Sequence, residues 1–313
     1  MKTHAPVHLA GYQGSASILT AALTKLARRL DGGTVGTPHL LPDVTSLGES
    51  AGSLFASLEK GERHIGYMAS GYLSARVPEL AVLDLPFTVQ DRQAALAALD
   101  GEAGVFLRDA VARQTGYHVL AFWDNGFRHI SNAVRPITKP EDCQGLVIRT
   151  LDSDLYRRAL SALGFTAITT DVKDLVRVLQ DGTVDAQENP LTNLLTFELW
   201  KHHPHVSLTG HFFGVLLLVC PRSWFERLDA AQRAELQQAV DEATALQRAS
   251  AAEQDASALT RLRSHGVHIA GMEDLDMARL QQATAGVRQQ SLSQLPPALV
   301  QAYLPALAAA GTH

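Results

Sequence analysis

The chain has 313 residues, which at roughly 150 residues per domain is enough for two domains that each bury a core. Its apolar fraction of 46% and charged fraction of 19% exclude disordered, collagen-like and disulfide-scaffold proteins. A net charge of -5 without a lysine and arginine cluster argues against a nucleic-acid-binding surface. The longest unbroken apolar run has six residues, 215–220, whereas a membrane span needs about 18 or more.

The first half of the chain is predicted to alternate strands and helices. Apolar runs predict strands near residues 7–10, 35–41, 64–69 and 117–123, and apolar residues at helical spacing predict helices over 15–30, 47–60 and 91–114. Glycine-containing segments after the first two helices are expected to end them. Strand, helix and strand in repeated order predict α/β units with a largely parallel sheet.

The same order restarts near residue 124, which predicts a second α/β unit. Its expected strands cover residues 146–150, 184–188 and 212–220, and its expected helices cover 152–163 and 172–180.

A long helix is predicted after these strands, because residues 229–264 contain neither glycine nor proline. Asp229 is a suitable N-cap, and His265 followed by Gly266 is a suitable C-terminal stop. At 1.5 Å per residue this helix would be roughly 54 Å long, so we expect it to brace both units. The alanine-rich end, residues 299–311, predicts a terminal helix with a frayed tail.

Two motifs point to other chemistry. The segment GESAG at residues 48–52 matches the G-x-S-x-G pattern of serine hydrolases, with Ser50 as the nucleophile. The residues before it lack the required strand and a glycine-rich oxyanion loop, so the turn at the start of a helix is the favoured interpretation. The second motif is a group of histidines interrupted by a proline and without acidic residues, which we interpret as surface histidines around a turn rather than a metal site. They are His202, His203, His205 and His211.

The two cysteines, Cys143 and Cys220, have no metal-binding spacing and lie in apolar stretches. We interpret them as buried free thiols, and a single disulfide between them is the alternative.

Polar side chains at two predicted strand ends suggest a site for a carboxylate. Arg149 ends the strand over 146–150, and ligands of open α/β sheets bind beyond the carboxyl ends of strands. Its guanidinium matches a carboxylate with two parallel hydrogen bonds, although a structural pair with an aspartate explains an isolated arginine equally well. Asn189 follows the strand over 184–188 and offers both a donor and an acceptor.

Several segments together carry a family resemblance. They are FWDNGFR (122–128), RPI (135–137), PEDCQGLVIRT (140–150), LQDGTVDAQENP (179–190) and LTGH (208–211), with PEL (78–80) and LPF (85–87) in the first half. In sequence and spacing they resemble the solute receptors of tripartite ATP-independent periplasmic (TRAP) transporters, of the dicarboxylate-receptor type. The resemblance covers most of the chain.

The resemblance implies a two-lobed, periplasmic-binding-protein-like α/β fold with hinge strands and a long helix spanning both lobes. The first lobe would comprise residues 1–124 plus 213–250, and the second 125–212 plus 251–313. By position, Arg149 would form the salt bridge to a ligand carboxylate, Asn189 would hydrogen-bond the same group, and Arg128 would add a second positive contact. The other residues expected near the cleft are Tyr12, Ala69, Trp123, Asp152, Val172 and Phe213.

The expected ligand is a small organic acid. Ala69 stands where sialic-acid receptors carry a carboxylate, and Val172 replaces an aromatic residue, which argues against a polyhydroxylated sugar acid. Aromatic residues near the cleft favour a monocarboxylate, or a short hydroxy or keto acid, with an apolar or aromatic body. Besides the hydrolase using Ser50, a ligand sensor with the same fold is an alternative.

The resemblance also implies a monomeric periplasmic receptor that is not an enzyme, uses no cofactor or metal, and delivers its ligand to TRAP membrane permease subunits. Residues 1–7 have one lysine and no apolar run, so we expect a cytoplasmic protein or one whose secretory signal has been removed.

Overall fold

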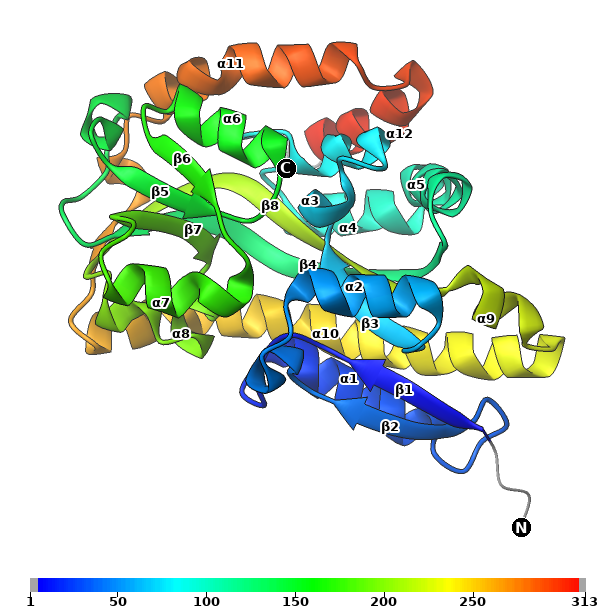
Figure 1. Ribbon diagram of the computed structural model, residues 1–313. Helices are drawn as coiled ribbons and strands as arrows, with labels where there is room; N and C mark the ends of the chain where they lie inside the picture. The colour runs from blue at the N-terminus through cyan, green and yellow to red at the C-terminus, as the bar shows by residue number, and fades with distance from the viewer. Residues whose placement is uncertain (1–4, 310–313) are drawn as a thin grey trace.

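The strands form one nine-stranded sheet in the computed structural model, which describes residues 5–309. Its order is β2-β1-β3-β8-β4-β7-β5-β6, and β9 pairs with β8 beside this path (Figure 1). We call the part built around β1, β2 and β3 the first lobe, and the part built around β5, β6 and β7 the second lobe.

Residues 5–114 supply the first lobe with three parallel strands and five α-helices, in the alternating order that the sequence predicts. The expected helix over residues 91–114 is in fact two helices, because the chain leaves the helical conformation at Gly101 with ψ near -146°. The elements are β1 (Pro6–Ala10), α1 (Ile18–Leu30), β2 (Thr37–Leu41), α2 (Ala51–Lys60), β3 (Ile65–Ala69), α3 (Ser70–Leu73), α4 (Arg92–Asp100) and α5 (Glu102–Gln114).

The second lobe repeats the arrangement with three further parallel strands. Apolar residues are buried on both faces of its sheet, against α6 and α11 on one side and α7, α8 and α10 on the other. Its short strand β6 was not predicted from the sequence. The elements are β5 (Val147–Thr150), α6 (Asp154–Ala162), β6 (Thr166–Thr169), α7 (Leu175–Gln180), β7 (Ala186–Pro190) and α8 (Leu191–Thr196).

Two long antiparallel strands, β4 (Tyr117–Asn132) and β8 (His205–Pro221), connect the lobes. The sequence predicts only the apolar part of each, because the remaining parts carry buried polar side chains that interrupt the apolar pattern. Their pairing shifts register between Asp124 and Gly126, and Gly126 adopts φ +89°, which glycine tolerates best. This irregularity coincides with the lobe boundary predicted at residues 124 and 125. The boundary itself remains a prediction.

The predicted long helix is confirmed as α10 (Ala230–Ser264), with 35 residues and Asp229 as its N-cap. It packs against α1 of the first lobe and α8 of the second, and Figure 1 shows it in yellow extending along both lobes. None of the helices within residues 5–309 is long and apolar enough to cross a membrane.

The chain ends in three elements beyond α10, which are β9 (His268–Ala270), α11 (Met277–Ser293) and α12 (Pro297–Ala309). The predicted terminal helix is confirmed as α12, and residues 310–313 of the expected tail lie outside the described residues. The domain prediction assigns this end to the second lobe, but α12 packs against α4 and α5 of the first lobe. The reason is that Leu299 and Tyr303 are buried in the first lobe's core.

The serine and cysteine motifs have structural roles. Ser50 is the N-cap of α2 and accepts a hydrogen bond from the Ser53 amide, which confirms the helix-start interpretation. Cys143 and Cys220 are free and buried in different cores, as predicted.

The surface interpretation of the histidines is wrong for two of them. His203 and His211 are buried, because their imidazoles take hydrogen-bonding partners inside the protein. The Nδ1 atom of His203 lies 3.0 Å from Ser131 Oγ, and that of His211 lies 2.7 Å from Thr209 Oγ1.

Candidate functional site

A small cavity of about 30 Å³ lies between the two lobes. It is found where β1, β3, β5 and β7 reach their carboxyl ends, the position at which open α/β sheets bind ligands. Its walls come from both lobes and from the connecting strand β4. The lining residues are Tyr12, Gln13, Ala69, Tyr72, Asn125, Arg128, Arg149, Leu151, Val172, Asn189, Asn193 and Phe197.

Six of the nine residues predicted for the cleft line this cavity. They are Tyr12, Ala69, Arg128, Arg149, Val172 and Asn189.

The other three predicted residues lie outside the lining. Trp123 is fully buried and points toward α10, where its Nε1 donates to Thr244 Oγ1 at 2.9 Å. Phe213 is buried against Phe127, and Asp152 is exposed in the turn after β5.

The lining also contains residues that the sequence analysis did not select. Gln13 directly follows Tyr12 in the loop after β1, and Asn193 lies four residues after Asn189, in the first turn of α8. Both residues could have been predicted, because each lies next to a predicted site residue along the chain or one helical turn from it. Tyr72, Asn125, Leu151 and Phe197 carried no comparable signal.

Arg149 is buried, with 2% of its surface exposed. Its Nε donates to Thr170 Oγ1 at 3.1 Å, and its Nη2 donates to the Thr170 carbonyl at 2.5 Å. No acidic side chain of residues 5–309 forms an ion pair with it, and burial lowers its pKa. A buried cation without a counter-charge is costly, so an anion entering the cavity would compensate it.

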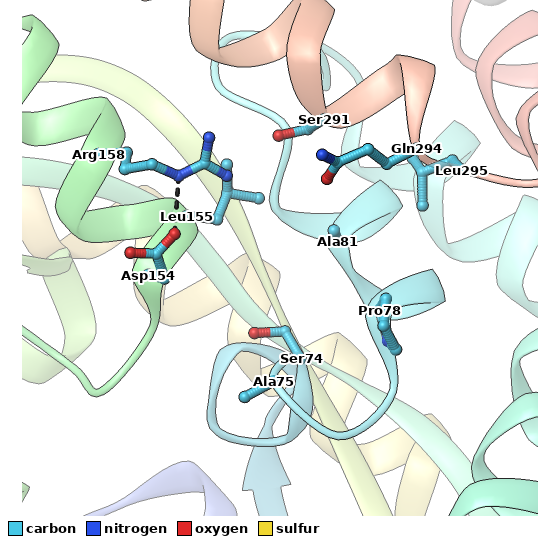
Figure 2. A pocket seen from close by; sticks show the side chains of 10 residues that line it. All are labelled: Ser74, Ala75, Pro78, Ala81, Asp154, Leu155, Arg158, Ser291, Gln294 and Leu295. Atoms are coloured by element: carbon cyan, nitrogen blue, oxygen red, sulfur yellow. Dashed lines mark ion pairs between the residues drawn. The ribbon is translucent and has the colours of Figure 1, made fainter.

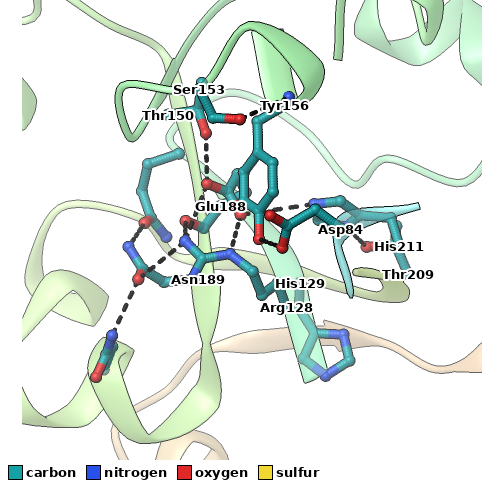
Figure 3. A network of polar contacts seen from close by, with 12 residues as sticks. Asp84, Arg128, His129, Thr150, Ser153, Tyr156, Glu188, Asn189, Thr209 and His211 are labelled. Carbon is teal, nitrogen blue, oxygen red and sulfur yellow. Dashed lines mark hydrogen bonds and ion pairs between the residues drawn. The ribbon is translucent and has the colours of Figure 1, made fainter. Parts of the chain in front are cut away.

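Arg128, in contrast, is already paired (Figure 3). Its Nε contacts Glu188 Oε2, and its Nη2 donates to Glu188 Oε1 at 3.0 Å and to Asn189 Oδ1 at 3.3 Å. Burial by itself raises the pKa of Glu188, but the opposite effect of Arg128 and His211 is larger. The net result is a pKa of about 2, so this carboxylate is ionised. This ion pair was not predicted from the sequence. Because Glu188 neutralises Arg128, Arg149 is the uncompensated cation of the cavity lining.

Amide side chains from both lobes form a chain of hydrogen bonds across the cavity. Gln13 Nε2 of the first lobe donates to Asn193 Oδ1 of the second at 3.5 Å, and Asn193 Nδ2 donates to Asn189 Oδ1 at 3.0 Å. Asn189 Nδ2 donates in turn to Gln187 Oε1 at 2.6 Å. The chain fixes the orientation of Asn189 and places donors and acceptors beside the guanidinium groups.

Two tyrosines, Tyr12 and Tyr72, line the first-lobe side of the cavity, and further aromatic rings pack behind Tyr12. The Tyr12 ring lies 4.8 Å from that of Tyr67 and 6.0 Å from that of Phe55, measured between centroids. Burial raises the pKa of Tyr12 well above its ordinary value, so its hydroxyl is neutral. Gly11 permits this packing, because a Cβ there would lie 2.7 Å from the Pro42 carbonyl oxygen.

A second cavity lies between the segment after α3, α6 and the end of α11 (Figure 2). Its lining includes one arginine, Arg158, whose Nε lies 2.8 Å from Asp154 Oδ2 and whose Nη1 donates to Gln290. Since this charge is already neutralised, the first cavity is the better carboxylate site. Within residues 5–309, no three His, Cys, Asp or Glu side chains are placed to hold a metal ion.

Several known proteins are similar to this chain, among them the following three. A solute-binding protein of Verminephrobacter eiseniae is 32% identical over 245 residues, covering 78% of this chain and 72% of the relative. The 2,3-diketo-L-gulonate-binding periplasmic protein YiaO of Escherichia coli is 29% identical, covering 82% and 77%. The crystal structure of a TRAP periplasmic solute binding protein from Ralstonia eutropha, with bound (S)-2-acetolactate, is 26% identical. It has a TM-score of 0.90 and covers 97% of this chain and 99% of its own.

These similarities confirm the predicted two-lobed α/β fold and favour a solute receptor over an enzyme. The model of one protein family, described as bacterial extracellular solute-binding protein, family 7, matches residues 11–294. This chain therefore belongs to the family 7 bacterial extracellular solute-binding proteins, the family of TRAP transporter receptors.

Proposed function

We propose that this protein is a periplasmic receptor that binds a short hydroxy or keto monocarboxylate between its lobes and delivers it to TRAP membrane subunits. The observation that carries the proposal is the buried guanidinium of Arg149, which lines the cavity without an acidic partner.

The charges of the cavity support one carboxylate rather than two. Glu188 balances Arg128, so the cavity offers a single uncompensated positive charge, at Arg149. A second carboxylate would enter a buried site without a free cation, which carries a large desolvation cost.

The rest of the lining suits a short oxygenated body. Amides of Gln13, Asn125 and Asn193 offer donors and acceptors to hydroxyl or keto oxygens, whereas Leu151 and Val172 offer apolar contacts. One similar protein fits this class, since its structure holds 2-acetolactate, whereas YiaO is named for 2,3-diketo-L-gulonate, a longer sugar acid.

The proposed mechanism is capture by lobe closure. Arg149 and Asn189 of the second lobe hold the carboxylate, while Tyr12 and Gln13 of the first lobe contact the body of the ligand. Such a ligand bridges the lobes and favours the closed form, because it binds that form more tightly than the open one. The strands β4 and β8 would act as the hinge.

A thermal-shift screen with 2-acetolactate, D-galactonate, 2,3-diketo-L-gulonate and the dicarboxylate succinate tests the proposal. A ligand at 100 times its Kd stabilises by about 2.7 kcal/mol, which corresponds to a rise of roughly 5 °C in Tm. We expect a monocarboxylate to produce this rise in the wild type and in Arg177→Ala, an exposed control arginine of the same lobe.

Arg149→Ala should lose the ligand-induced rise and keep the ligand-free Tm within a few degrees. An unchanged rise in Arg149→Ala would refute the assignment of this residue. A larger rise with succinate, or with either six-carbon sugar acid, than with 2-acetolactate would refute the ligand class. Delivery is tested by uptake into vesicles that carry the permease, and uptake independent of the receptor would contradict it.

A further inference from the structure

A tyrosine of the second lobe reaches a buried aspartate of the first lobe (Figure 3). Tyr156 lies on α6, and its hydroxyl donates to Asp84 Oδ1 at 3.0 Å. Ser70 of α3 donates to the same oxygen at 2.9 Å. Tyr156 and Asp84 are almost completely buried, so water does not compete for this hydrogen bond between the lobes.

The ring of Tyr156 supports the candidate site from behind. One face stacks on Phe212 of β8, with centroids 4.1 Å apart and planes inclined by 15°. The guanidinium carbon of Arg128 lies 5.6 Å from the ring centroid, within the range of a cation–π contact. Tyr156 itself does not line the cavity, whereas Arg128 does. The tyrosine therefore joins a first-lobe carboxylate to a cavity-lining cation.

The lobes approach each other closely beside this contact. Gly71 of α3 faces Leu151 and Ser153, which connect β5 to α6. A Cβ on Gly71 would lie 2.8 Å from Leu151 Cδ1 and 3.3 Å from Ser153 Cβ. Since α6 follows this connection directly, we infer that separation of Gly71 from Leu151 and Ser153 would also move Tyr156 away from Asp84.

We propose that Tyr156 is a positioning residue that couples lobe closure to the site, because Asp84 fixes its hydroxyl while its ring supports Arg128. The inference rests on the proposed function, in which Arg128 lines the ligand cavity. Closing the lobes forms the Tyr156–Asp84 bond and sets the ring under the guanidinium, and opening them breaks the bond.

The ionisation of Asp84 gives the coupling a pH dependence. Burial raises the pKa of Asp84 to about 7, and hydrogen bonds from Ser70 and Tyr156 oppose this rise. Arg128 of β4 lowers it and Glu188 of β7 raises it, while Tyr303 of α12 also faces the group. Opening would return Asp84 toward water and lower its pKa, so closure takes up a proton. The closed form should therefore lose population as the pH rises through about 7.

The test measures the distance between spin labels on the two lobes of the ligand-free protein. Cysteines introduced at the exposed Lys60 and Arg177 carry the labels, since both native thiols are buried. We expect Tyr156→Phe to increase the population at long distance relative to the wild type. The matched control is Tyr117→Phe, which removes a hydroxyl that donates to the Phe55 carbonyl at 2.7 Å within the first lobe, and it should leave the distances unchanged.

Two further readouts complete the experiment. The wild-type distance distribution should shift toward the open form between pH 6 and pH 8, and the Asp84→Asn distribution should not. Tyr156→Phe should weaken binding of the best acid in the thermal-shift panel by about tenfold, the size expected for one buried hydrogen bond.

The distance measurement needs no ligand, so it separates failure of this inference from failure of the proposed function. An unchanged distance distribution in Tyr156→Phe would overturn the coupling, even in a protein that binds acids. Absence of binding to every acid in the panel would count against the proposed function alone.

Discussion

Replacing Gly71 by alanine should stabilise the free receptor and weaken its ligand binding. Gly71 lies in α3, where alanine is favoured over glycine by about 0.5–1 kcal/mol. In the closed arrangement the added Cβ would lie 2.8 Å from Leu151 Cδ1 and 3.3 Å from Ser153 Cβ, closer than carbon atoms normally pack. Overpacking of this kind costs about 1–3 kcal/mol, so affinity should fall by roughly 5- to 150-fold.

The assay compares the Tm of the ligand-free protein with the Kd measured by calorimetry for the best acid in the panel. The control is Gly52→Ala in α2, where the added Cβ would meet only Ser50 Oγ, at 3.7 Å. That variant should gain stability without losing affinity. Equal affinity of Gly71→Ala and the wild type would refute the view that the lobes meet at this glycine when ligand is bound.

Further predictions concern buried ionisable groups. The pKa of Asp84 is raised from 3.8 to about 7, so the folded state binds more protons than the unfolded state between these values, and the free energy of unfolding should fall over that range. Between pH 5 and pH 8 this loss is at most about 3 kcal/mol, and Asp84→Asn should remove it in denaturant titrations at these two pH values. An unchanged pH dependence would contradict the cause. Glu188→Gln removes the counter-charge of Arg128, so it should lower the free energy of unfolding by about 3 kcal/mol. The freed guanidinium should also allow succinate to raise the Tm. A variant with wild-type stability and no response to succinate would argue that Glu188 does not neutralise Arg128. Burial raises the pKa of the Cys143 thiol to about 12 and also raises that of Cys220. Both thiols should therefore react with a thiol reagent only after denaturation. Rapid labelling of the folded protein would show that they are accessible.

The sequence alone determined the α/β organisation, the long helix and two residues of the cavity. Apolar periodicity, glycine stops and the Asp229 N-cap are local signals, and the elements formed close to where these signals placed them. Arg149 and Asn189 were found for a similar reason, since each ends a recognisable strand and parallel strands bring such ends together.

Local signals failed where polar groups satisfy one another over long distances. The polar parts of β4 and β8 did not read as strands, although Asp124 is buried and its backbone bonds to the Gln247 side chain of α10. Trp123 and Phe213 lie on these same strands. The direction of their side chains depends on the pairing register of β4 with β8, which shifts near Gly126 and could not be derived from the sequence.

Only the tertiary structure decided which arginine of the cavity carries a free charge. Arg128 and Arg149 are the same residue type, and both lie at strand positions beside the cleft. Folding brings Glu188 against Arg128 across 60 residues of sequence, while Arg149 donates to the hydroxyl and carbonyl of Thr170 and forms no ion pair within residues 5–309. The difference arises because a buried charge is set by the groups that surround it in space, and the neighbours in sequence do not specify those groups.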